Sequence, residues 1–72
     1  TRTVVAIVEF DPDHQRRSGN DPALLFGRLR TLGRCWSVDW DGTATPCDAA
    51  PARTTDLLVV SDDPTANELG LL

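Results

Sequence analysis

The sequence predicts one small α+β domain, residues 1–72, with a ferredoxin-like split βαβ order of strand, helix, strand, strand and helix. Three observations lead to this prediction. Two short runs, residues 3–10 and 57–60, are rich in β-branched residues and apolar on both faces, which is typical of interior strands. A third run alternates between apolar and polar side chains. Two stretches place a capping side chain beside a proline, as helix starts do. We expect a mainly antiparallel sheet in which the last strand of the full arrangement is missing.

The first predicted strand covers residues 3–10 and ends at the turn-forming sequence Asp11-Pro12-Asp13. Because its side chains are apolar on both faces, we expect it in the middle of the sheet. Residues 14–20 are polar and end in Ser-Gly-Asn, so they are predicted to form a loop.

A helix is predicted to begin at Pro22, because Asn20 and Asp21 supply capping side chains directly before a proline at the first helical position. Its apolar face is marked by leucines at spacings of four and three, namely Leu25, Leu29 and Leu32. Gly33 follows and is expected to take the left-handed conformation that ends many helices. We expect the residues of this helix-cap motif to have a structural role: Gly19, Asn20, Asp21, Pro22 and Gly33.

The second predicted strand, residues 35–40, alternates strictly, so that Trp36, Val38 and Trp40 share one face. A half-exposed strand of this kind is expected at the edge of the sheet. Residues 41–51 begin with an Asp-Gly turn and are rich in Ala, Pro, Thr and Asp. They are predicted to form a surface connection with little regular structure.

Residues 57–60 are the third predicted strand, lying beside the first strand in the middle of the sheet. The Ser-Asp-Asp-Pro sequence that follows repeats the capping signal, and a second helix is predicted to run from Pro64 towards Leu72. In a split βαβ arrangement both helices cover one face of the sheet, which would leave Val5 and Ile7, or the residues that alternate with them, on the other face.

Charge and composition narrow the classes of function. A net charge of −4 and a pI of 4.6 weigh against a nucleic-acid ligand, which requires a concentrated positive surface. No apolar run approaches the roughly 20 residues that cross a bilayer, and the first residues do not resemble a signal peptide. We therefore expect a soluble, cytoplasmic domain without membrane insertion. Cys35 and Cys47 are too few for a disulfide framework and are expected to be reduced, partly buried thiols.

The sequence shows no pattern typical of a catalytic or cofactor site. His14 is the only histidine and falls in the predicted loop, where a solvated side chain is expected. The aspartate pairs lack the spacing of a calcium-binding loop and are explained by turns and helix caps. No nucleophile can be paired with a base. We therefore expect no catalytic residue, no metal and no cofactor.

Several short motifs resemble one protein family. They are Phe10-Asp11-Pro12, Ser18-Gly19-Asn20-Asp21-Pro22, Leu29-x-x-Leu32-Gly33, Pro46 and the stretch from Asp56 to Pro64. Over roughly residues 4–69 the chain resembles the small regulatory domain of CheA-type chemotaxis histidine kinases, which lies between the phosphotransfer domain and the kinase core. The resemblance implies a ferredoxin-like module without the phosphorylated histidine or the nucleotide site. The parent protein would be a histidine kinase of a two-component phosphorelay.

The function implied is a non-catalytic protein-interaction module that docks a response-regulator receiver domain or other domains of the same kinase. The residues that we expect to contact the partner are Trp36, Val38, Trp40 and Arg28. The aromatic face of this strand is either a contact patch for the partner or part of the core under the helices.

Two other functions stay open at this point. A small-molecule-binding regulatory domain would have a similar topology and would need a polar pocket. A structural self-association domain would use the first strand, whose outer edge is unpaired when the last strand of the family is missing. Such an edge is a template for pairing with a second chain, which would give a homodimer.

Overall fold

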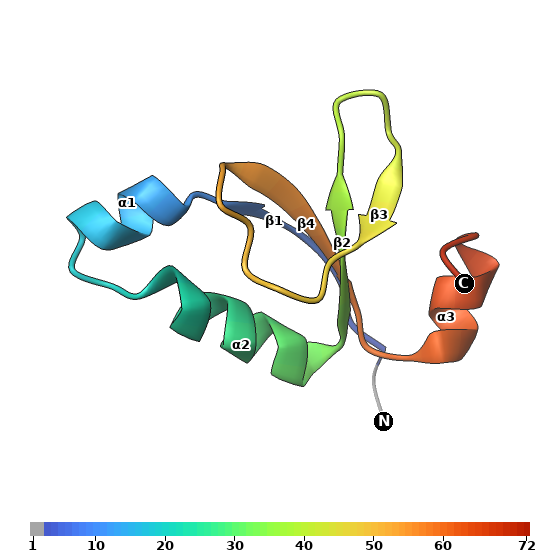
Figure 1. Cartoon of the computed structure of the whole chain (residues 1–72). Coiled ribbons are helices and arrows are strands. Elements are labelled where there is room, and N and C mark those ends of the chain that lie inside the picture. The colour runs from blue at the N-terminus through green and yellow to red at the C-terminus, as the bar shows by residue number, and fades with distance from the viewer. Residues whose placement is uncertain (1–2) are drawn as a thin grey trace.

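The computed structural model describes residues 3–72 as an α+β fold with an antiparallel sheet and three helices (Figure 1), which confirms the predicted fold class. In chain order the elements are β1 (Val5–Phe10), α1 (Pro12–Arg17), α2 (Pro22–Leu32), β2 (Arg34–Val38), β3 (Ala44–Pro46), β4 (Thr55–Val60) and α3 (Asp63–Glu68). The four strands are arranged in the order β1-β4-β2-β3. This architecture is compatible with a ferredoxin-like split βαβ arrangement.

β4 lies in the interior of the sheet, as predicted for the third strand, and pairs with β1 on one side and β2 on the other. The predicted interior position of β1 is wrong for the described part of the chain, where β4 is its neighbour on one side and the other side is open. The predicted edge position of β2 is also wrong. Residues 44–46, expected in an irregular connection, form β3 and cover the outer side of β2.

β2 and β3 form a hairpin whose backbone hydrogen bonds extend beyond the two short strands. At its base the N–H of Cys47 donates to the carbonyl of Cys35 at 2.9 Å, and near its tip the N–H of Asp39 donates to the carbonyl of Thr43 at 2.9 Å. Gly42 closes the predicted turn with a φ of 88°, a left-handed conformation that suits glycine. The sequence did not predict β3 because Ala and Pro have a low strand propensity. The strand forms because the backbone bonds of the hairpin compensate for that propensity.

Each helix begins at an aspartate whose side chain accepts a hydrogen bond from a backbone N–H of the first turn, with a proline in that turn. The bonds run from His14 to Asp11 at 3.0 Å, from Ala23 to Asp21 at 2.9 Å and from Thr65 to Asp62 at 2.8 Å. α2 begins and ends where the sequence predicted. The predicted loop over residues 14–20 is partly wrong, because the Asp-Pro cap starts α1 although this short helix has no apolar stripe.

α3 is shorter than predicted. It begins at Asp63, one residue before the predicted start, because the cap is Asp62. It ends at Glu68, and Gly70 follows with a φ of 77°. This left-handed glycine turns the chain out of the helix before Leu72.

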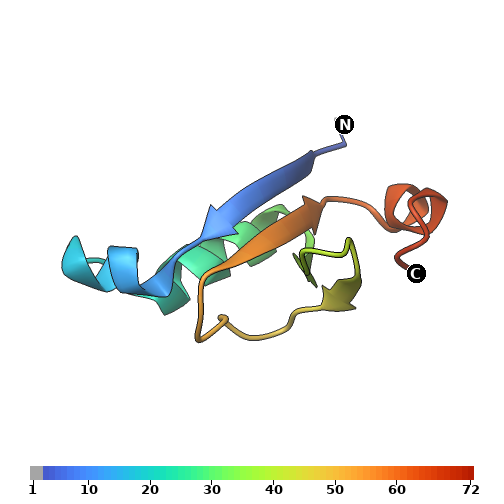
Figure 2. The ribbon, with the colours of Figure 1, turned by 90° about the horizontal axis from the view of Figure 1, so that it is seen from above.

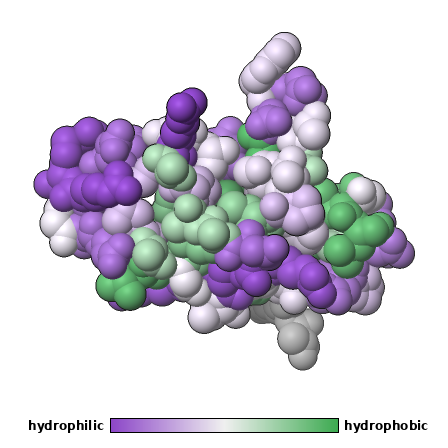
Figure 3. All heavy atoms as spheres, viewed as in Figure 1, coloured by the Kyte–Doolittle hydropathy of each residue, from purple (hydrophilic) through white to green (hydrophobic). Residues whose placement is uncertain are grey.

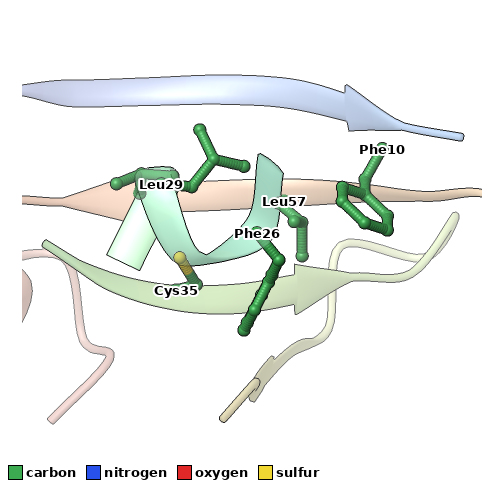
Figure 4. Packing of buried hydrophobic residues seen from close by; sticks show 6 residues of the cluster. Phe10, Phe26, Leu29, Cys35 and Leu57 are labelled. Carbon is green, nitrogen blue, oxygen red and sulfur yellow. The ribbon is translucent and has the colours of Figure 1, made fainter. Parts of the chain in front are cut away.

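The sheet carries a hydrophobic cluster on each face. Directly paired residues of antiparallel strands share a face, so the register sends alternate residues of β4 to opposite sides. The cluster between the sheet and α2 (Figure 4) consists of Phe10, Phe26, Leu29, Cys35, Leu57 and Val59. The cluster on the other face consists of Trp36, Val60 and Ala66. Cys35 and Trp36 are neighbours in β2 and therefore belong to different clusters.

α2 and α3 lie on opposite sides of the sheet (Figures 1 and 2), which corrects the prediction that both helices cover one face. Trp36 gives the physical reason, because its large side chain points away from α2 and is covered by Ala66 of α3. With only six residues, α3 covers one end of this face. Of the two alternating sets of β1 residues, Val5 and Ile7 are the ones that lie on this face, away from α2, and they are 50% and 70% exposed.

Gly33 joins α2 to β2 in an extended conformation, with a φ of 167°, so the predicted left-handed conformation is wrong. Space is what requires glycine here. A Cβ at this position would lie 2.1 Å from the backbone oxygen of Val60 and 2.7 Å from the Cα of Ser61. α2 can therefore lead directly into β2 beside β4 only without a side chain at residue 33.

We predict that Gly33→Ala lowers the free energy of unfolding by about 2 to 3 kcal/mol, because the backbone of β4 must move to admit the methyl group. Gly27→Ala is the matched control. Its Cβ would meet nothing within 4 Å on α2, so it should raise stability by about 0.5 to 1 kcal/mol through helix propensity. Urea denaturation measures both changes, and a Gly33→Ala variant as stable as the parent chain would contradict the close approach.

The cap of α3 predicts a pH dependence of stability. The Thr3 hydroxyl donates to Asp62 at 2.6 Å, and this bond, followed by the bonds from Thr65, lowers the pKa of the Asp62 carboxyl from its ordinary value of 3.8. A carboxyl whose pKa is lower in the folded state stabilises the fold above its unfolded pKa, and the stabilisation is lost as the pH falls below that value.

Asp62→Asn keeps a good capping side chain but removes the charge. We therefore expect the stability of the parent chain to fall more steeply than that of Asp62→Asn between about pH 5 and pH 2. Chemical denaturation at a series of pH values measures the two slopes. Equal slopes would show that the Asp62 carboxylate does not contribute to the stability of the fold.

Candidate functional site

The structure separates the aromatic residues that the sequence placed on one face. Trp36 is 2% exposed and packs against Val60 and Ala66, whereas Trp40 is 99% exposed. β2 ends at Val38, so the alternation of side chains stops before Trp40, which is the first residue of the turn between Asp39 and Thr43. Trp36 is therefore core, and Trp40 projects from the tip of the hairpin.

Trp36 carries the one buried side-chain nitrogen or oxygen in residues 3–72 that has no hydrogen-bond partner, its Nε1 atom. A buried donor without a partner reduces stability by about 1 to 3 kcal/mol. The apolar part of the ring outweighs this cost, because burial of a tryptophan removes about 150 to 250 Å² from water. Trp36 thus stabilises the α3 side of the sheet, and only 2% of the residue is exposed for contact with a partner.

A hollow of about 330 Å³ lies beside Trp40 on the hairpin. It is lined by Val38, Asp39, Trp40, Thr54, Thr55 and Asp56. Val38 is half-buried and pairs with Asp56 of β4, which in turn pairs with Glu9 of β1. This part of the sheet therefore places carboxylates of two strands, β1 and β4, and of the turn near one apolar side chain and one exposed indole ring.

The tip of the hairpin keeps its negative charge at neutral pH. The N–H of Thr43 donates to the Asp41 carboxylate at 2.9 Å, and this bond, with the Thr43 hydroxyl, lowers the pKa of Asp41. Asp39 and Asp56 add their charges in the neighbouring hollow, whose lining includes no basic residue. A surface of this kind favours contact with positively charged groups, both by direct attraction and by stacking of a cation on the indole ring.

Arg28 lies on a different surface. It is exposed on α2 and lines a small hollow of about 170 Å³ with Gln15, Asn20, Asp21, Leu24 and Leu25. Gly19 and Asn20 of the helix-cap motif connect α1 to α2 there, where the N–H of Asn20 donates to the carbonyl of Gln15 at 2.8 Å. The four predicted partner-binding residues are therefore divided among the core, the hairpin and α2.

A third hollow, of about 400 Å³, opens at the base of the hairpin. Its lining residues are Arg30, Arg34, Cys35, Trp36, Pro46, Asp48 and Leu72. Both arginines are already paired, Arg30 with Asp48 at 2.8 Å and Arg34 with Asp63 at 2.8 Å. No local pattern predicted this group, because its residues come from distant parts of the chain.

The outer edge of β1 is open within residues 3–72. Val4 accepts a hydrogen bond from the N–H of Ser61 at 2.9 Å, so the even-numbered residues of this segment direct their backbone groups towards β4. Val5, Ile7 and Glu9 therefore direct their backbone N–H and carbonyl groups outwards. Figure 3 shows a further apolar region over α3 and the residues that follow it, with Leu69 52% and Leu72 55% exposed.

The described residues hold no group of three His, Cys, Asp or Glu side chains that could bind a metal ion. His14 is exposed on α1, where its N–H helps to form the cap of that helix. Among residues 3–72, no helix has both the length and the apolar character needed to cross a membrane.

Fold and surface together define a small α+β domain with an open sheet edge and an exposed aromatic hairpin. Comparisons of the chain with models of protein families, with curated proteins and with solved structures found no match.

Proposed function

We propose that this domain is a non-catalytic protein-interaction module that contacts its partner through the tip of the β2–β3 hairpin. The observation that supports this most directly is Trp40, which is 99% exposed beside an acidic hollow. Burial of a tryptophan against a partner contributes about 5 kcal/mol before the costs of association. Tryptophan is also enriched among the residues that dominate binding energy in interfaces.

The charge around Trp40 indicates the chemistry of the partner. Asp39, Asp41 and Asp56 surround the ring or lie beside it, and the whole chain has a net charge of −4. A complementary surface would present Arg or Lys to this region. The partner proposed from the sequence resemblance is the receiver domain of a response regulator, or another domain of the same chemotaxis histidine kinase, in the cytoplasm.

The positions of the histidine, the cysteines and the arginines in residues 3–72 favour a role without catalysis. The exposed His14 lies on α1, away from the two cysteines at the base of the hairpin, and the arginines near those cysteines are held by Asp48 and Asp63. Catalysis by a nucleophile requires a base within hydrogen-bonding distance, and the Sγ atom of Cys47, the more exposed thiol, donates to the carbonyl of Ala49 instead of to a base. In the proposed parent kinase, other domains would carry out phosphoryl transfer.

We predict that Trp40→Ala weakens binding to a receiver domain at least tenfold, because the proposed contact is lost while the fold is unaffected. Amide NMR titration with receiver domains of the same organism measures the affinity and maps the surface. The melting temperature should stay that of the parent chain. Arg28→Ala is the comparison variant on the other surface. If Arg28→Ala weakens binding and Trp40→Ala does not, α2 forms the contact and the hairpin proposal is wrong.

The second candidate function is self-association through the edge of β1, which its three outward-facing residues favour. An antiparallel pair of β1 strands centred on Ile7 would place Ile7 opposite Ile7 and Val5 opposite Glu9 of the second copy. All outward-facing backbone groups of Val5, Ile7 and Glu9 would then be paired. The strand contains neither Lys nor Pro, its pairing with β4 is regular, and Glu9 is its one charged residue, so few of the usual devices that block edge pairing are present.

If this candidate function is correct, the parent chain shows a concentration-dependent equilibrium of monomer and dimer in sedimentation equilibrium. Ile7→Lys should then be monomeric at every concentration, because a charge at the centre of the edge opposes pairing. Leu24→Lys is the control, since Leu24 is 65% exposed on α2 and Ile7 is 70% exposed on β1. A parent chain that stays monomeric excludes self-association and leaves the hairpin proposal unaffected.

A further inference from the structure

Cys35 and Cys47 stand directly opposite each other at the base of the β2–β3 hairpin. The register of the two strands pairs Trp36 with Pro46, and its continuation by one residue sets Cys35 opposite Cys47. The hydrogen bond from the N–H of Cys47 to the carbonyl of Cys35, 2.9 Å long, joins the two residues across the base of the hairpin. In such pairs the Cα atoms lie about 5.5 Å apart, which is within the range found across disulfides.

The two side chains also share a face and a surrounding. Directly opposite residues of an antiparallel pair project to the same side of the sheet. Cys35 belongs to the cluster beneath α2, and Cys47 packs against that same cluster. Both cysteines are free thiols, and the Sγ atom of Cys47 donates to the carbonyl of Ala49 at 3.2 Å. Rotation of the Cys47 side chain away from this weak bond is the movement that joins the sulfur atoms.

Access and charge differ between the two thiols. Cys35 is 3% exposed, and burial raises the pKa of its thiol, whereas Cys47 is partly exposed. The guanidinium of Arg30 donates to the carbonyl of Cys47 at 3.1 Å, so a positive charge lies beside this cysteine. The thiolate is the reactive form of cysteine, and an oxidant must be able to reach it. The more accessible Cys47 is therefore the thiol that reacts first.

We propose that Cys35 and Cys47 are a reversible thiol–disulfide pair that is oxidised by low-molecular-weight disulfides such as oxidised glutathione. The Cys47 thiolate attacks one sulfur of oxidised glutathione, forms a mixed disulfide and releases one glutathione thiolate, which takes up a proton. The Cys35 thiolate then attacks the Cys47 sulfur, forms the Cys35–Cys47 bond and releases the second glutathione. Two cysteine thiols are oxidised and one glutathione disulfide is reduced to two thiols.

The bond would enclose the whole hairpin, including Trp40 at its tip. Closing this loop removes conformations from the unfolded chain and so raises the melting temperature. It also holds together the base from which the tip projects. If the hairpin is the contact surface proposed above, oxidation lowers the conformational entropy that the hairpin loses on binding. The thiol chemistry itself does not depend on the proposed function.

The test uses the whole chain incubated with oxidised glutathione, quenched with acid and measured by intact-mass spectrometry. We expect the parent chain to lose the mass of two hydrogen atoms, to carry no glutathione and to melt about 5 to 15 °C higher. Dithiothreitol should reverse all three changes. Cys35→Ser should instead keep one glutathione on Cys47, because no second thiol is present to displace it.

Cys47→Ser tests the order of reaction without altering the buried cysteine. It should remain unmodified under conditions that oxidise the parent chain, because Cys35 is 3% exposed. A parent chain that stays reduced, that retains a glutathione adduct or that forms disulfide-linked dimers would overturn the proposal. Because mass alone decides these outcomes, they are independent of whether Trp40 binds a receiver domain.

Discussion

The described fold depends on β4, the strand that is paired on both sides and packed on both faces. Leu57 and Val59 face α2, whereas Val60 faces α3, and all three are at most 1% exposed. A chain of 72 residues has little apolar surface to bury. A strand that packs in two clusters therefore stabilises the fold with few residues. Loss of β4 would remove the strand pairing of β1, the pairing of β2 on one side and both clusters together.

The two-sided packing of β4 determines what remains outside the core. β2 lies against β4, and its adjacent residues Cys35 and Trp36 enter opposite clusters. Beyond Val38 the hairpin has passed the packed part of the sheet, so Trp40 finds no cover from either helix. Trp40 is thus exposed because the hairpin extends beyond the part of the sheet that is packed on its two faces.

Local patterns in the sequence predicted β1, β2, β4, α2 and the start of α3, because apolar runs and Asp-Pro caps are local signals. α1 was missed because its cap starts a polar helix, and β3 because backbone pairing forms it against weak propensity. The three expected strands follow one another as predicted, but β3 covers the side of β2 that was expected to be open, and β1 lies at an edge of the described sheet although it is apolar on both faces. For the candidate site, strict alternation placed Trp36 and Trp40 together, since the pattern does not reveal where a strand ends. The pairing of Cys35 with Cys47 depends on the register, which no local pattern contains.

The hairpin register connects the two proposed properties of the domain. The pairs that run from Cys35 and Cys47 at the base to Asp39 and Thr43 near the tip leave Trp40 in the turn. A shift of one residue would separate the cysteines and move the side chains of β3 to the other face. A change in the thiols at the base therefore acts on the same ladder that positions the indole ring. β2 and β3 are neighbours in the described sheet. A disulfide at the base would therefore also restrict the motion of the turn that carries Trp40.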